Sequence, residues 1–122
     1  MNKKIMIVED EECLLRLASI IFTSRGYEVI GVTDGLQALD VLTRNKIDLV
    51  LLDVMLPGID GFEVCQRIKQ QPQHADLPVV MLTAKKNRED LARGNEVGAA
   101  WYITKPFKSA NVIETVERLL HQ

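Results

Sequence analysis

Five short runs of aliphatic and β-branched residues recur along the chain and predict five β-strands. They occupy residues 5–8, 27–32, 49–52, 79–82 and 101–104. Three of these runs are continuously apolar rather than alternating, which is typical of parallel strands that are covered on both faces. We therefore expect helices on both sides of one sheet.

The segments between the strands carry apolar residues at helical spacing. The predicted core-facing stripes are Leu14, Leu17, Ala18 and Ile21; Leu36, Leu39 and Leu42; Val64, Cys65 and Ile68; and Val112, Ile113, Val116, Leu119 and Leu120. Asp34 and Asp60, each followed by glycine, mark the start of the second and third helices. A fourth helix at residues 88–97 has few apolar positions and is the weakest prediction. The repeated strand–helix order predicts right-handed crossovers in a doubly wound α/β fold, one domain over residues 1–122.

Composition and charge exclude several classes of protein. Hydrophobic residues make up 47% and charged residues 26% of the 122 positions, as in globular rather than disordered chains. Fifteen basic against seventeen acidic residues give a net charge of -2, without the basic excess that binding to nucleic acid requires. No apolar run has the length of a membrane span or a signal peptide, so we expect a cytoplasmic protein without a membrane partner. Cys13 and Cys65 form no C-x-x-C pair and are interpreted as structural.

Polar residues follow directly after four of the five predicted strands. They are Glu9 with Asp10, Asp53, Thr83 and Lys105. Because parallel strands all point the same way, these side chains are expected to converge at the carboxyl edge of the sheet, where open α/β folds bind ligands. Carboxylates about 4 Å apart repel by roughly 4 kcal/mol per pair at an effective dielectric constant near 20. Oxygen ligands without histidine or thiol favour a hard divalent cation, and a site that also admits phosphate favours Mg²⁺.

A simpler interpretation applies to part of the acidic run. Acidic side chains at residues 9–12 also complement the dipole of the first helix. We accept that role for Glu11 and Glu12. For Glu9 and Asp10 the equivalent positions of Asp53 and Lys105 favour a site instead.

Four motifs at these strand ends resemble the receiver domain of two-component response regulators over nearly the whole chain. They are Ile7-Val8-Glu9-Asp10-Glu11, Leu52-Asp53-Val54-Met55-Leu56-Pro57-Gly58 with Asp60-Gly61-Phe62, Leu82-Thr83-Ala84, and Tyr102-Ile103-Thr104-Lys105-Pro106-Phe107. Each motif is weak alone, whereas four in order at the expected strand ends are specific. The resemblance implies a flavodoxin-like (βα)5 fold with a five-stranded parallel sheet in the strand order 2-1-3-4-5.

The resemblance implies a role for each acidic residue of the site. Asp53 is expected to be the phosphoacceptor, which attacks the phosphorus of a phosphohistidine or a small acyl phosphate. Mg²⁺ is expected to bind the side chains of Asp10 and Asp53 and the backbone carbonyl of Met55, with Glu9 acting through a bound water. Glutamate is one methylene longer than aspartate, so its mode of coordination is the open point.

The remaining family residues imply a phosphorylation-dependent switch. Lys105 is expected to place its ammonium group on a phosphoryl oxygen, and Thr83 to bond the phosphoryl group through its hydroxyl. Tyr102 matches the aromatic residue that turns inward when Thr83 moves. The readout is expected on the face made by the fourth helix, fifth strand and fifth helix, where Trp101 is predicted to be partly exposed, either to contact a partner or to pack within the fold.

The expected partners follow from the same resemblance. They are a histidine kinase or histidine phosphotransfer protein as donor, and a downstream output protein or domain as target. The chain is expected to catalyse only its own phosphorylation and dephosphorylation, so it is not an enzyme for an external metabolite.

Three other functions compete with this interpretation. A haloacid-dehalogenase-type aspartyl phosphatase needs a second aspartate where the chain has Met55. A flavodoxin-like or nucleotide-binding module needs a phosphate-binding loop rich in glycine or hydroxyl groups after the first strand, where this chain has four acidic residues. A degenerate receiver that acts only as a docking module would not require Asp10, Asp53, Thr83 and Lys105. We therefore favour a Mg²⁺-dependent phosphoacceptor.

Overall fold

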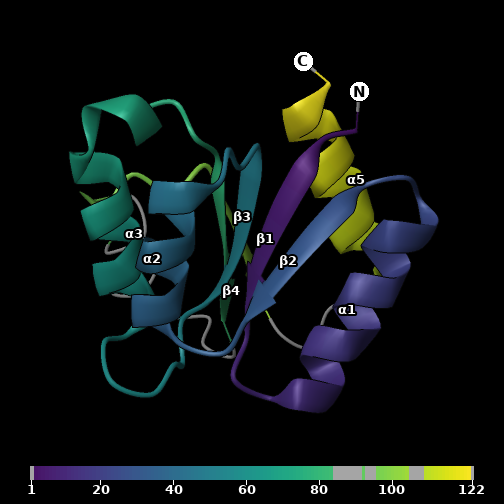
Figure 1. Ribbon diagram of the computed structural model, residues 1–122, viewed down its shortest axis with the longest axis horizontal. Coiled ribbons are helices and arrows are strands. Elements are labelled where there is room, and N and C mark those ends of the chain that lie inside the picture. The colour runs from purple at the N-terminus through teal and green to yellow at the C-terminus, as the bar shows by residue number, and fades with distance from the viewer. Residues whose placement is uncertain (1, 84–91, 93–95, 105–108, 122) are drawn as a thin grey trace.

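The fold is a parallel β-sheet between two layers of helices (Figure 1). The computed structural model describes residues 2–83, 92, 96–104 and 109–121. The strands are β1 (Lys4–Val8), β2 (Glu28–Val32), β3 (Leu49–Asp53), β4 (Val79–Thr83) and β5 (Trp101–Thr104). All pairings are parallel, in the order β2-β1-β3-β4-β5. The predicted strand order and the doubly wound architecture are therefore confirmed.

The described helices lie on both faces of the sheet, as the apolar strands predict. Figure 1 shows α2 (Gly35–Arg44) and α3 (Gly61–Gln70) on one side and α1 (Glu12–Ser24) and α5 (Ser109–Leu120) on the other. A short 3-10 turn, η1 (Pro72–His74), follows α3. The fourth helix predicted at residues 88–97 falls mainly outside the described residues. Among those residues, no helix is long and apolar enough to span a membrane.

The two faces of the central strands explain their continuous hydrophobicity. Successive side chains of β1, β3 and β4 point to opposite faces, and both faces are covered. Met6, Val50 and Met81 belong to the cluster beneath α2 and α3. Ile5 and Leu51 belong to the second cluster, beneath α1 and α5. Each strand therefore needs an apolar residue at nearly every position.

The helical stripes predicted from spacing are correct for two helices. In α3, Val64, Cys65 and Ile68 are buried. In α5, Val112 and Val116 are buried and the other predicted residues pack partly against the same cluster. The apolar pattern alone therefore predicts which face of each of these two helices is buried.

The predicted stripe of α1 is only partly right, because Leu14 and Leu17 are exposed, whereas Ala18 packs against the core. The inward face carries Leu15 and the buried Phe22 together with Ala18. One residue corresponds to a rotation of about 100° around an α-helix, so a shift of one position changes the buried face.

Contacts at both ends of α1 explain this rotation. Leu15 lies against Gly31 of β2, where a Cβ would come within 3.0 Å of the Leu15 side chain. Phe22 packs edge-on against Tyr27 with ring centroids 6.0 Å apart.

In α2 the apolar spacing also predicts the buried face only in part, since Leu36 is exposed while Ala38 and Leu42 are buried.

The two cysteines have different environments. Cys65 is buried, and its thiol lies 3.5 Å from the carbonyl oxygen of Val97 as a hydrogen-bond donor. Burial raises the pKa of the Cys65 thiol to about 11, although the nearby Lys69 opposes the shift. The predicted structural role is therefore confirmed for Cys65. Cys13 is exposed in the first turn of α1, so a core-packing role for it is wrong.

Two capped helix starts and one close glycine contact shape the carboxyl edge of the sheet. Asp34 accepts a hydrogen bond from the Gln37 N–H at 2.8 Å, and Asp60 accepts one from the Glu63 N–H at 2.9 Å. The sequence predicts the Asp34 cap and the start of the third helix after Asp60. Gly61 donates its N–H to the carbonyl of Val54 at 2.9 Å, which brings the start of α3 onto the end of β3.

We predict that Gly61→Ala destabilises the protein despite the higher helix propensity of alanine. A Cβ at Gly61 would overlap the backbone of Asp53 and Val54, which cannot move aside as a flexible side chain can. Overpacking of this kind costs about 1–3 kcal/mol, against a propensity gain of about 1 kcal/mol. Urea denaturation measures the change.

The control for this prediction is Gly35→Ala. At Gly35 the new methyl group meets only the side chains of Ile59 and Val64, so we expect a smaller loss of stability. Equal or higher stability of Gly61→Ala than of the unmodified chain would contradict the steric argument.

Candidate functional site

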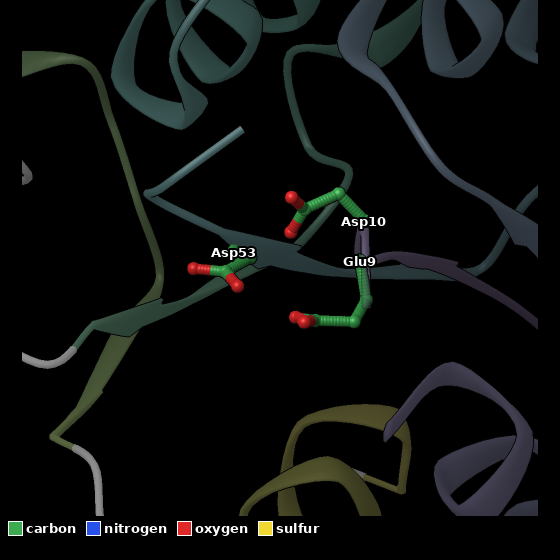
Figure 2. Close-up of side chains that lie close together, drawn as sticks. All are labelled: Glu9, Asp10 and Asp53. Atoms are coloured by element: carbon green, nitrogen blue, oxygen red, sulfur yellow. The ribbon is translucent and has the colours of Figure 1, made fainter. Parts of the chain in front are cut away.

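Three carboxylates meet at the carboxyl ends of two neighbouring strands. Glu9 and Asp10 directly follow β1, and Asp53 is the last residue of β3. The register pairs Val8 with Leu52, so the two strand ends are level. One carboxylate oxygen from each residue lies within 4.8 Å of the others. Figure 2 shows the three carboxylate groups gathered in one small region, Asp53 from β3 and the other two from the end of β1.

Burial makes this acidic group electrostatically costly. Asp53 is only 3% exposed and Glu9 6% exposed, whereas Asp10 is exposed. At a separation of 4.8 Å each ionised pair repels by about 3 kcal/mol at an effective dielectric constant near 20. Backbone donors help to hold the carboxylates: the Met55 N–H donates to Asp53 Oδ1 at 3.0 Å, and the Glu11 N–H to Glu9 Oε1 at 3.4 Å.

A cavity of about 490 Å³ opens above the three carboxylates. Its lining residues are Glu9, Asp10, Glu11, Asp53, Val54, Met55, Leu56, Pro57 and Asp60. Met55 is 60% exposed, so its side chain lies at the solvent boundary of the site. The space is large enough for a cation with several waters and for a phosphoryl-sized group.

The donor set fits a hard divalent cation. The three carboxylates offer oxygen ligands, which Mg²⁺ and Ca²⁺ prefer, and they form the one group of three or more acidic, histidine or cysteine residues with metal-site geometry in the described parts of the chain. Sequence reasoning did not include Asp60 among the site residues. Asp60 lines the cavity and also caps α3. Its position in the segment that follows Asp53 is the sequence feature that could have identified it.

Thr83 and Tyr102 lie on the same face of the sheet, on neighbouring strands. Thr83 ends β4 and is fully buried, one position beyond Leu82, which pairs with Asp53. Tyr102 of β5 pairs with Met81, two residues before Thr83, and its half-buried ring packs against the cluster beneath α2 and α3. Lys105, the other predicted strand-end residue, lies outside the described residues.

Trp101 faces the opposite side of β5. It is 48% exposed, which confirms the predicted partial exposure. The guanidinium carbon of Arg118 on α5 lies 4.6 Å from its ring centroid, a cation–π contact that sequence reasoning did not predict. Trp101 and Arg118 therefore join β5 to α5 at the surface.

Comparison with known proteins identifies the family. The response regulator receiver domain family matches residues 5–117, and the chain belongs to this family. These signalling domains partner with histidine kinases and with output domains.

Individual relatives agree with this assignment. The chain is 43% identical over 122 residues to the alkaline phosphatase synthesis transcriptional regulatory protein PhoP of Bacillus subtilis, covering 100% of this chain and 50% of PhoP. It is 40% identical over 119 residues to the response regulator PleD of Caulobacter vibrioides, covering 98% of this chain and 26% of PleD. A putative response regulator from Chloroflexus aurantiacus has a similar structure, with a TM-score of 0.93, 33% identity and full coverage of both chains. The chain thus spans half or less of the two curated relatives.

We predict that Asp53→Asn stabilises the protein in metal-free buffer. Removing one charge from the buried group relieves repulsion from Glu9 and Asp10, while the amide oxygen still accepts the Met55 N–H. The expected gain is about 1–3 kcal/mol at low ionic strength. Thermal denaturation with a chelator present measures it.

Asp48→Asn is the matched control, because Asp48 accepts a hydrogen bond from the Lys4 N–H at 2.8 Å at the other end of the sheet. This variant should show no gain. A melting temperature of Asp53→Asn at or below that of the unmodified chain would contradict the electrostatic account.

Proposed function

We propose that the chain accepts a phosphoryl group on Asp53 in a Mg²⁺-dependent reaction and changes its output face in response. The main observation in support of this proposal is the buried Asp53 carboxylate, which lies within 4.8 Å of two other carboxylates and lines a cavity at the carboxyl edge of the sheet. A carboxylate in this position combines a nucleophilic oxygen with a cation site. The family of signalling proteins to which the chain belongs supports the same function.

The chain's own residues supply the cation site. Asp10 and Asp53 would hold Mg²⁺ through their side chains, Met55 through its backbone carbonyl, and Glu9 through a water. When bound, Mg²⁺ offsets the negative charge of the carboxylates and of the phosphoryl oxygens. The Met55 N–H orients the Asp53 carboxylate through Oδ1 at 3.0 Å.

Phosphoryl transfer then needs little further chemistry from the protein. A carboxylate oxygen of Asp53 attacks the phosphorus of a phosphohistidine, the P–N bond breaks, and the donor imidazole leaves with the bonding electron pair. The product is an acyl phosphate on Asp53, which water later hydrolyses. Lys105 and the Thr83 hydroxyl stabilise the phosphoryl oxygens during both steps.

The switch connects the site to the face formed by β5, α5 and the expected fourth helix. Thr83 moves toward the phosphoryl group, and Tyr102, on the same face of the neighbouring strand, turns inward. A histidine kinase or a histidine phosphotransfer protein is the donor. A downstream output protein or domain reads the changed face, on which Trp101 and Arg118 are exposed.

The other functions fit the site less well. An aspartyl phosphatase requires a second acidic group two residues after the nucleophile, where the exposed Met55 side chain supplies none. A module that only docks partners would not require the costly approach of three carboxylates. The acetyl phosphate experiment described next distinguishes phosphorylation from a function in docking alone.

We predict that acetyl phosphate modifies the chain only when Mg²⁺ is present. Intact-mass analysis should detect a phosphoryl adduct that is absent with chelator and absent in Asp53→Asn. Asp60→Asn is the matched control, since it changes a carboxylate that lines the same cavity and retains a good helix cap. It should still be modified.

Equal modification of Asp53→Asn and the unmodified chain would place the acceptor elsewhere. Failure of both to react, under conditions in which the protein is folded, would favour the docking module.

We further predict that the Thr83 hydroxyl carries the signal to β5. Trp101 is the single tryptophan of the chain and neighbours Tyr102, so its fluorescence should change on phosphorylation. Thr83→Val should still be modified on Asp53 but lose most of this change. Thr83→Ser, which retains the hydroxyl, should keep it. A full fluorescence change in phosphorylated Thr83→Val would contradict the role of the hydroxyl.

A further inference from the structure

A second cavity lies between the C-terminal halves of α2 and α3, next to η1. Its volume is about 270 Å³, and its described lining residues all differ from those of the carboxylate site. Figure 1 places η1 and the ends of α2 and α3 at one end of the molecule, whereas β1 and β3 end at the other. A ligand in this cavity would therefore not compete with chemistry at Asp53.

The floor of this cavity is apolar. Leu42 and Ile68 are buried and belong to the hydrophobic cluster beneath α2 and α3, and Leu39 packs against the same cluster. A cavity of roughly 150 Å³ with aliphatic walls admits benzene. The larger volume and similar floor suit a ligand with a small apolar body.

The rim carries polar groups and a positive charge. Thr43, Arg67, Gln71 and His74 contribute to it, and none of the described residues that line the cavity carries a carboxylate. Arg67 pairs with Glu63 at 3.4 Å, but both side chains are about half exposed, so the pair contributes little and can exchange for another anion. The charge of the rim therefore favours a negatively charged ligand.

His74 adds to the cavity wall a polar side chain with an unsatisfied nitrogen. Its Nδ1 is buried and has no hydrogen-bond partner among the described residues. The backbone holds the residue in place, since the His74 N–H donates to the Gln71 carbonyl at 2.9 Å and the Leu77 N–H donates to the His74 carbonyl at 3.1 Å. Buried polar atoms of this kind are rare, and leaving one without a partner costs about 1–3 kcal/mol. Nδ1 has almost no accessible surface, so a ligand oxygen accepts a hydrogen bond from it only when the imidazole ring turns toward the cavity.

We propose that this cavity binds a small carboxylate with an aromatic or aliphatic body. The apolar body packs on Leu42 and Ile68, and the carboxylate accepts hydrogen bonds from Arg67 and, once its ring has turned toward the cavity, from His74. This site is separate from the proposed phosphorylation of Asp53 and does not depend on it.

Benzoate and benzyl alcohol test the proposal as a pair of probes of similar size and different charge. Each is titrated into the ¹⁵N-labelled chain up to about 10 mM, and amide chemical shifts are followed by NMR. Benzoate should give saturable shifts centred on residues 39–43 and 67–74. Benzyl alcohol should bind at least about tenfold more weakly, because it lacks the charge that Arg67 recognises.

Two arginines provide a matched comparison. Arg67 and Arg44 are each in the last turn of a helix and each pair with an acidic residue four positions earlier at 3.4 Å, but only Arg67 lines the cavity. Arg67→Gln should weaken benzoate binding about tenfold or more, and Arg44→Gln should leave it unchanged. Thr43→Trp, at an exposed position of the rim, should block binding in a chain that remains folded.

Three results would overturn the proposal. They are the absence of saturable shifts with benzoate, equal weakening by Arg67→Gln and Arg44→Gln, and binding of benzyl alcohol as tight as that of benzoate.

Discussion

The structure depends on the forced approach of three carboxylates at the ends of β1 and β3. The register of two parallel strands places Asp53 beside Glu9 and Asp10, with two of the three side chains nearly excluded from water. Their repulsion opposes folding, and the backbone donors Met55 N–H and Glu11 N–H offset part of it. The apolar burial of the central strands must therefore exceed this penalty before any cation is bound. A site of this kind is stable because of the sheet beneath it.

The surrounding elements are arranged to hold that site rigidly. β1, β3 and β4 are apolar on both faces, so sliding one strand along its neighbour would break two packed layers. Asp60 caps α3 at the same edge, and Gly61 lets that helix begin directly against the backbone of Asp53 and Val54. The loop that carries Met55 is thereby held between the end of a strand and the start of a helix.

Much of the fold could be predicted from the sequence because burial on both faces leaves a strong signal. Continuous apolar runs identify the strands, and apolar residues at helical spacing identify the buried faces of α3 and α5. The rotation of α1 could not be predicted, since Leu14 and Leu17 have the same spacing as a buried pair and only contacts with Gly31 and Tyr27 distinguish Leu15 and Phe22. The convergence of Glu9, Asp10 and Asp53 followed from strand polarity. The cavity beside His74 could not be predicted from the sequence, because it depends on how α2 and α3 separate at their C-terminal ends.

The contrast between the two thiols has a practical consequence. Cys13 lies in water in the first turn of α1, whereas Cys65 is enclosed and strongly disfavours its thiolate form. The unaltered chain thus offers one addressable sulfur for a fluorophore or spin label, three residues along from Asp10. Movements around the acidic group can be followed from that position without engineering a cysteine.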